Sequence, residues 1–166
     1  MAVVNTTEWT VEAAWISVLD ALTDLAACDV RRWRDQSKDT TDSNYLPAVL
    51  VHCDGAGIPD DWGIYGVEEC DVDLAALTYV ADDLTGSAVK AYLGAIRDKV
   101  MTPIVPADLE GAVGGIKVYA IIPNGPTRNN DSDTVRMRVM PVRCFVSMTL
   151  SVTTTSTTTT TSTTTT

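Results

Sequence analysis

Histidine, paired cysteine and aromatic residues are scarce in this sequence. His52 is the single histidine, aromatic residues make up 6% of the chain, and the cysteines stand 17 to 74 residues apart without a C-x-x-C pair. A structural zinc site needs about four ligands, usually at short paired spacings, so we expect no metal and no cofactor. Free cysteine suits burial as a small apolar residue, and Cys70 falls on the apolar side of its predicted strand, as that role requires. A domain of this length needs none of the four as disulfides: Cys28, Cys53, Cys70 and Cys144.

Long apolar runs are also missing. No stretch approaches the ~20 apolar residues of a membrane helix, and the first ten residues lack the basic, apolar and small-residue order of a signal peptide. We therefore expect a soluble chain, made in a reducing cytoplasm, that contacts no membrane. Its 166 residues predict a single domain over residues 1–150 and a low-complexity Thr/Ser tail over residues 151–166. Threonine favours extended backbone, and we expect the assembled protein to hold this tail.

Positive charge is absent from the middle of the chain. Between residues 39 and 89 there is no Lys or Arg, although this stretch holds eleven of the 22 acidic residues in a chain of net charge −10. Such a balance opposes affinity for nucleic-acid phosphates. It predicts a strongly negative region, for which nine residues are candidates as an acidic surface or channel lining: Asp54, Asp60, Asp61, Glu68, Glu69, Asp71, Asp73, Asp82 and Asp83.

Two amphipathic helices are indicated by apolar residues at helical spacing. The first begins where Asn5 and Glu8 have the spacing of a capping box, and it extends to about Ala27. The second starts near residues 85–87 and ends before Pro103. Its apolar residues recur at i, i+3, i+4, i+7 and i+11, at Val89, Tyr92, Leu93, Ile96 and Val100.

Four strands are predicted by β-branched or alternating runs at residues 46–53, 68–80, 116–122 and 135–150. The first ends at the turn signal Asp54-Gly55. In the second, alternation places Cys70, Val72 and Leu74 on one side and the acidic residues on the other. Pro141 interrupts the last strand and favours an edge position or a bulge there.

The remaining segments are predicted to be loops, except residues 29–35, which suit either a strand or a helix end. Residues 55–66 predict an irregular excursion anchored by Trp62, and residues 103–115 and 123–133 predict loops rich in Gly, Pro or polar residues. The predicted class is α+β, with two helices packed on one face of a mostly antiparallel sheet of about four strands. We expect one core formed by Trp15, Val18, Leu22, Val72, Leu74, Leu93 and Ile96.

No catalytic constellation is evident in the sequence, so we expect a protein that is not an enzyme. His52 and Cys53 are adjacent on a predicted strand and therefore point to opposite faces, which prevents a nucleophile and base pair. The carboxylate pairs at residues 60–61 and 68–69 have no partner motif. The glycines of residues 111–115 precede a strand, whereas a phosphate-binding loop opens a helix.

The order of these elements resembles tail terminator proteins of long-tailed bacteriophages and archaeal tailed viruses. The resemblance covers about residues 7–150 and is carried by the helix around Trp15, the strand LPAVLVHC, the acidic strand ECDVDLAALTYV, the helix SAVKAYLGAIRDKV and two closing strands. It implies a structural virion protein of the tail and neck, assembled in the host cytoplasm. The threonine tail lies outside that family's pattern.

The resemblance further implies a hexameric ring that caps the tail tube and joins it to the head. Its partners would be copies of itself, the tail tube protein and the head-tail connector or stopper protein, and DNA would pass through without specific binding. Another neck or tail-completion protein is an alternative, as is a small-molecule-binding or hydrolytic α+β domain. The last predicted strand carries three arginines that would face either a neighbouring subunit's acidic surface or the chain's own acidic strand: Arg136, Arg138 and Arg143.

Overall fold

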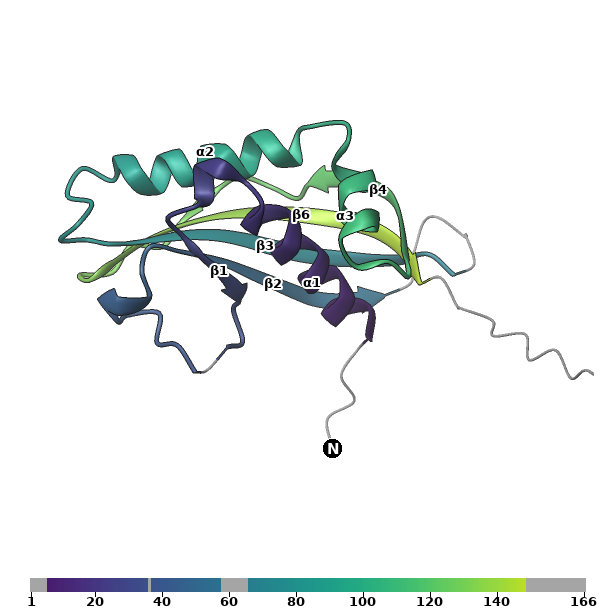
Figure 1. The fold of residues 1–166 in the computed structure, drawn as a ribbon, viewed down its shortest axis with the longest axis horizontal. Coiled ribbons are helices and arrows are strands. Elements are labelled where there is room, and N and C mark those ends of the chain that lie inside the picture. Colours follow the sequence, from purple (N-terminus) through teal and green to yellow (C-terminus); the bar gives the residue numbers. More distant parts are fainter. Residues whose placement is uncertain (1–5, 36, 58–65, 149–166) are drawn as a thin grey trace, which may run out of the picture.

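The computed structural model describes residues 6–35, 37–57 and 66–148 (Figure 1). Within them lie three α-helices: α1 (Thr6–Asp20), α2 (Ser87–Val100) and α3 (Val105–Val113). Two short 3-10 helices span Thr23–Leu25 and Ser43–Tyr45. The strands are β1 (Asp29–Arg32), β2 (Ala48–Gly57), β3 (Glu68–Tyr79), β4 (Ile116–Pro123), β5 (Arg128–Asn129) and β6 (Val135–Met148).

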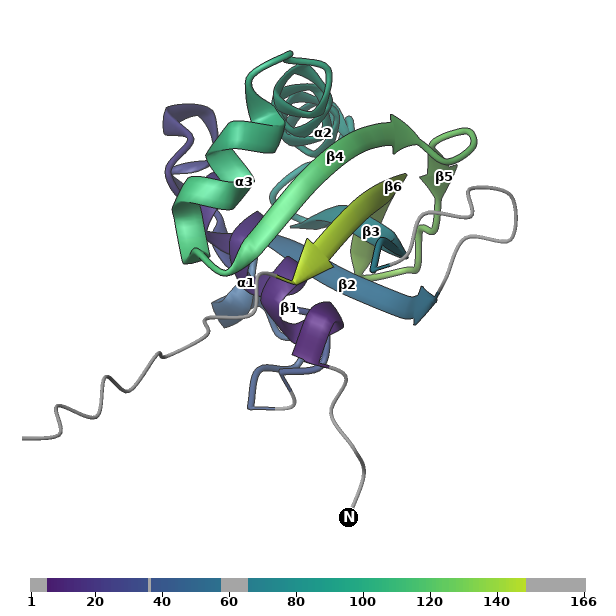
Figure 2. The same cartoon turned by 90° about the vertical axis from the view of Figure 1, so that its right-hand side faces the viewer.

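The strands form one mixed sheet in the order β1-β2-β3-β6-β4, with β5 pairing the same edge of β6 as β4. β1 runs parallel to β2, and every other pairing is antiparallel. Figure 2 shows the three helices on one side of this curved sheet and β4 at its margin. The predicted α+β class with a mostly antiparallel sheet is therefore confirmed, whereas the helix packing differs from the prediction, because three helices and not two cover this side.

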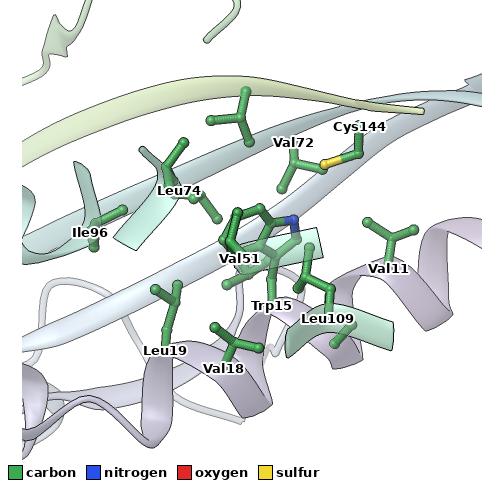
Figure 3. Packing of buried hydrophobic residues seen from close by; sticks show 14 of the residues in the cluster. Val11, Trp15, Val18, Leu19, Val51, Val72, Leu74, Ile96, Leu109 and Cys144 are labelled. Carbon is green, nitrogen blue, oxygen red and sulfur yellow. The ribbon is translucent and has the colours of Figure 1, made fainter. Parts of the chain in front are cut away.

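The main core fills the space between the helices and the sheet (Figure 3). Trp15 of α1 is fully buried there, between α3 and the strands β2, β3 and β6. Five of the residues predicted to share this core are buried in it, and Leu22 and Leu93 pack against it while partly buried. The apolar side of β3 is also confirmed, because Cys70, Val72 and Leu74 all belong to this cluster.

The opposite face of the sheet is divided into an apolar half and a charged half. The apolar half is a second, smaller cluster that includes Leu50 of β2, Leu77 of β3 and Val139 of β6. Further along the same strands the residues on this face become His52, Asp54, Asp71 and Asp73. We call the charged half the charged face, and it is described below.

The helical prediction was incomplete in two places. α3 occupies a segment predicted to be a loop, because Pro106 lies in the first turn of the helix, where its missing N–H costs no hydrogen bond. The glycine pair that suggested a loop instead ends the helix, with Gly114 and Gly115 at φ of 66° and 72°. The first helix stops at Asp20 and not near Ala27, and Thr23–Leu25 forms a separate 3-10 turn. Asn5 lies outside the described residues.

The predicted strand count of about four was too low, because residues 29–35 contain β1 and the predicted loop 123–133 contains β5. β2 also continues past the expected turn at Asp54-Gly55, since Gly55 adopts φ 75° at a bulge in the pairing with β3. Pro141 lies in the central strand β6 and not at an edge. Its carbonyl accepts the Asn124 N–H at 2.9 Å, so its ring nitrogen faces the interruption between β4 and β5, where no ladder donor is needed.

Candidate functional site

The charged face arises from strand alternation in β2 and β3. Every second residue of β3 up to Leu74 faces the helices, so the residues between them, Glu69, Asp71 and Asp73, face the other way. Asp54 of β2 stands directly opposite Asp71, which places two carboxylates side by side across the strands. Like charges in that position repel each other unless a cation lies between or beside them.

Two arginines supply that cation. Arg143 of β6 donates from Nε to Asp71 Oδ1 at 2.8 Å, and its Nη1 lies 2.7 Å from Glu69 Oε1. The hydrogen bond to Asp71 and the two nearby carboxylates raise the pKa of Arg143. Arg128 of β5 donates to Asp73 Oδ1 at 2.6 Å. Two arginines therefore offset half of the charge of the four carboxylates, and Asp54 is the exposed carboxylate on this face without a cationic partner among the described residues.

A shallow cleft of about 270 Å³ opens on the charged face. It is lined by three of these carboxylates and five further residues: Asp54, Asp71, Asp73, His52, Asn124, Pro126, Arg128 and Pro141. Asn124 donates its side-chain N–H to Asp71 at 3.0 Å, so the cleft is already bound together by internal hydrogen bonds. His52 lines the cleft, whereas the Cys53 side chain is buried in the helix-facing core, so they form no nucleophile and base pair.

The other predicted acidic residues are dispersed. Glu68 accepts a hydrogen bond from the Thr7 hydroxyl of α1, and Asp82 is exposed in the turn after β3. Asp83 is buried and accepts the N–H groups of Ala88 and Val89 at 3.1 and 3.0 Å, which are free donors in the first turn of α2. Burial raises the pKa of Asp83, but these hydrogen bonds lower it by a larger amount. The pKa of Asp83 is therefore below its usual value. Asp60 and Asp61, like Trp62, lie outside the described residues.

The other two arginines named as interface candidates also find partners within the chain. Arg136 donates to the carbonyl oxygens of Asp83 and Leu84, both at 2.9 Å, and thereby closes the turn before α2. Arg138 is mostly buried and pairs with both carboxylate oxygens of Asp131, in the loop before β6. Of the three arginines, Arg143 pairs with the acidic strand, whereas Arg136 and Arg138 bind a turn and a loop of the same chain. An intersubunit contact for these arginines stays a prediction.

Sequence reasoning missed a second polar cluster, at the edge of β2 beyond the end of β1. Glu12 of α1 is 1% exposed and accepts the Cys53 N–H at 3.0 Å, while Arg34 donates to the Cys53 carbonyl at 2.7 Å. Glu8 accepts the next outward N–H, that of Gly55, at 3.1 Å. Side chains thus take the place of a neighbouring strand, and we call this edge the closed margin. Glu12 lies three residues before Trp15 on the apolar stripe of α1, a signal that could have revealed its burial.

Large exposed apolar side chains gather at the two ends of the sheet. Trp9 and Trp33, 49% and 38% exposed, lie beside β1, where the Arg32 guanidinium stacks 3.6 Å from the Trp9 ring centroid. At the other end, Tyr119 and Ile122 of β4 are 53% and 46% exposed. The same end carries three further exposed residues on α3 and the α2–α3 connection: Met101, Ile104 and Val113.

All four cysteines are buried and free, which confirms the predicted burial of Cys70 and extends it to Cys28, Cys53 and Cys144. Hydrogen bonding to Cys70 and burial raise the pKa of Cys53, and burial raises that of Cys144 to about 12. Within the described residues, no three histidine, cysteine or carboxylate side chains come together as metal ligands. None of the helices described combines the length and apolarity needed to cross a bilayer.

Comparison of the chain with protein-family models and with curated proteins finds no match.

Proposed function

We propose that this protein is a structural virion component that caps a tail tube as a hexameric ring and joins it to the head connector. The order of elements that carries the resemblance to tail terminators supports this proposal. The described fold has that order, from α1 through β2, β3 and α2 to the closing strands β4 and β6. Another neck or tail-completion protein would share this architecture, and both belong to the same class of assembly proteins.

The observation that carries the assembly role is the unlike character of the two ends of the sheet. One end presents tryptophan and arginine, the residues most enriched in binding hot spots, and the other presents Tyr119 and Ile122 on an edge strand. Two different apolar surfaces at opposite ends of one subunit favour head-to-tail contacts, which generate a ring when the rotation closes. A dimer with a twofold axis would need one self-complementary surface instead.

The charge distribution fits a ring through which DNA passes. A net charge of −10 disfavours retention of phosphates, and the exposed Asp54 and Asp82 keep part of the surface negative after internal pairing. We propose that these residues face the channel. The alternative of a small-molecule-binding or hydrolytic domain would use the cleft on the charged face, where the carboxylates of Asp71 and Asp73 are already held by arginines.

The direct test is particle size and shape of the purified chain, alone and with tail tubes, by light scattering and negative-stain electron microscopy. We expect six-membered rings, at least on tube ends. Replacing Tyr119 and Ile122 by Glu should abolish them, because these side chains are exposed at the proposed contact. Leu84→Glu is the matched control, since Leu84 is 76% exposed in the turn before α2, away from both ends of the sheet.

Folded protein that stays monomeric or dimeric in both conditions, and does not bind tubes, would contradict the proposal. Charge reversal of Arg136 and Arg138 is a less selective test, because both arginines hold internal turns and Arg138 is mostly buried. A loss of assembly in that variant would be accompanied by a loss of stability.

A further inference from the structure

The outer edge of β4, which we call the open margin, lacks the protection that the closed margin has. No strand of the described residues lies beyond β4, which spans Ile116–Pro123 and carries a single charged residue, Lys117. One side chain approaches the backbone at this edge, because Glu110 of α3 accepts the Val118 N–H at 2.8 Å. An edge strand of this length and low charge is a template on which another chain can add a strand.

The chain itself contains a segment with the composition of an added strand. Of the 16 residues from 151 to 166, twelve are Thr, three are Ser and one is Val, without charge, glycine or proline. β-branched side chains favour extended backbone, and threonine is among the residues enriched in strands. Among the described residues, β6 is the last strand of the sheet and ends at Met148, so this segment follows the sheet in the chain.

The place where this segment leaves the domain sets what it can reach. β6 ends at Met148, which pairs with Ile116 at the start of β4. To pair with its own β4, the chain would have to turn at once around Gly115 and Ile116, where α3 connects to β4. Residues 149–166, at about 3.3 Å per residue, span roughly 60 Å when extended, which suffices to reach an adjacent subunit.

We propose that the open margin receives residues 149–166 of a second copy as an added strand. This inference rests on the proposed ring, and it names the contact that joins each subunit to the next. Each copy contributes one segment and one open margin, so the contact is head-to-tail and leaves no open margin unpaired when the ring closes. Backbone hydrogen bonds supply the pairing, and Tyr119 and Ile122 supply apolar contacts for alternate threonine side chains.

The test uses hydrogen exchange of the β4 amides in full-length chains. In a proline variant, four threonines of the segment are replaced by Pro, which removes the N–H groups that a strand needs: Thr154, Thr157, Thr160 and Thr163. The matched control replaces the same four by Val, which keeps the N–H groups and the branched shape. An isotopically labelled proline variant is mixed with unlabelled wild-type chain, and exchange is read by mass spectrometry on the labelled β4 peptides alone.

We expect wild-type and valine chains to protect the labelled β4, by about 100-fold when their concentration is about 100 times the dissociation constant. Unlabelled proline variant should give no protection. The inference is overturned if no chain protects the labelled β4. The inference is also overturned if β4 of the wild-type chain is protected to the same extent at every protein concentration while β4 of the labelled proline variant stays unprotected in the mixture. That result would mean that residues 149–166 pair with β4 of their own chain.

Electron microscopy of the same samples separates this inference from the proposed function. Rings in which β4 is unprotected would contradict the strand exchange and would still support the proposed ring. Protection of β4 in open chains or dimers, without rings on tubes, would support the strand exchange and contradict the proposed ring. Neither protection nor rings would contradict both.

Discussion

The closed margin and the open margin differ in whether the unpaired backbone groups of an edge are bound by side chains of the same chain. At the closed margin, three side chains from α1 and the segment after β1 bind the free N–H and carbonyl groups of β2. At the open margin, Glu110 binds one N–H of β4 and exposed apolar side chains stand beside the rest. An edge that is blocked by its own chain is excluded from strand pairing, whereas an edge left open is available for it. The difference indicates which end of the subunit can accept a strand.

The largest effect should come from breaking the closed margin with Glu12→Ala. The Glu12 carboxylate is 1% exposed, pairs with Arg32 at 3.1 Å and accepts the Cys53 N–H, so its removal leaves buried groups unpaired. We expect a loss of about 3 to 5 kcal/mol in the free energy of unfolding, measured with urea. Glu12→Gln keeps the acceptor and should lose less. A loss below about 1 kcal/mol for Glu12→Ala would mean that solvent replaces this carboxylate easily.

Asp83 lies away from both margins, so the loss of stability in Asp83→Asn is a reference for the loss in Glu12→Ala. Asp83→Asn weakens the hydrogen bonds to the first turn of α2 and should cost about 1 to 2 kcal/mol. The pKa of Asp83 is lowered in the folded chain, so its stabilisation is present above the unfolded value of about 3.9 and is lost as the pH falls through the lower folded value. The wild type should therefore lose stability in this acid range more steeply than Asp83→Asn, in urea titrations at several pH values.

Thiol reactivity sharpens the comparison at the closed margin. Cys53, Cys70 and Cys144 are fully buried, and the raised pKa of each of Cys53 and Cys144 disfavours the reactive thiolate. We expect the wild-type thiols to react with a disulfide reagent only as fast as the domain unfolds. In Glu12→Ala, Cys53 should become the first to react, because its backbone loses the hydrogen bond that holds the end of β2. Equal acceleration of all four cysteines would instead indicate global destabilisation.

The smallest effect on stability is expected at the open margin, for Glu110→Gln. The Val118 N–H lowers the pKa of Glu110, with a smaller contribution from Lys117. The carboxylate contact is therefore present above a pH of about 4.3 and is lost as the pH falls through the lower folded pKa. Relative to its intrinsic rate, exchange of the Val118 amide should accelerate over that range in the wild type. In Glu110→Gln, the amide oxygen keeps a neutral acceptor for this N–H, so the rate relative to the intrinsic rate should no longer depend on pH. A pH dependence equal to that of the wild type would show that another group protects this amide.

Much of the fold was predictable because local patterns matched their tertiary roles. Alternation in β3 separated the buried Cys70, Val72 and Leu74 from the acidic face, and helical spacing identified α2. Prediction was wrong where one residue type serves two structures. Pro106 and the glycine pair at 114–115 suggest a loop, yet they begin and end α3, and Gly55 suggests a turn, yet it forms a bulge within β2.

The candidate site was predictable only as a set of residues. The sequence indicated that Asp71 and Asp73 share a face and that the last strand carries the arginines. It left open whether the arginines face the chain's own acidic strand or a neighbouring subunit, and it did not indicate the register that places Arg143 beside Asp71, because that register depends on contacts between residues 72 positions apart. The partner of Arg138 was likewise unpredictable, since Asp131 reaches it from a loop.

The sequence by itself determined the class of the fold, the apolar faces of its elements and the burial of Cys70, because these follow from the periodicity of side chains along a single element. The tertiary structure alone decided which strands lie at the edges and how each edge is finished. In the sequence, Glu12 is one more charged residue on a helix. Only packing places its carboxylate against the backbone N–H of Cys53, 41 residues away. Edge protection depends on where the ends of elements meet in space, and that information is not contained in any local pattern.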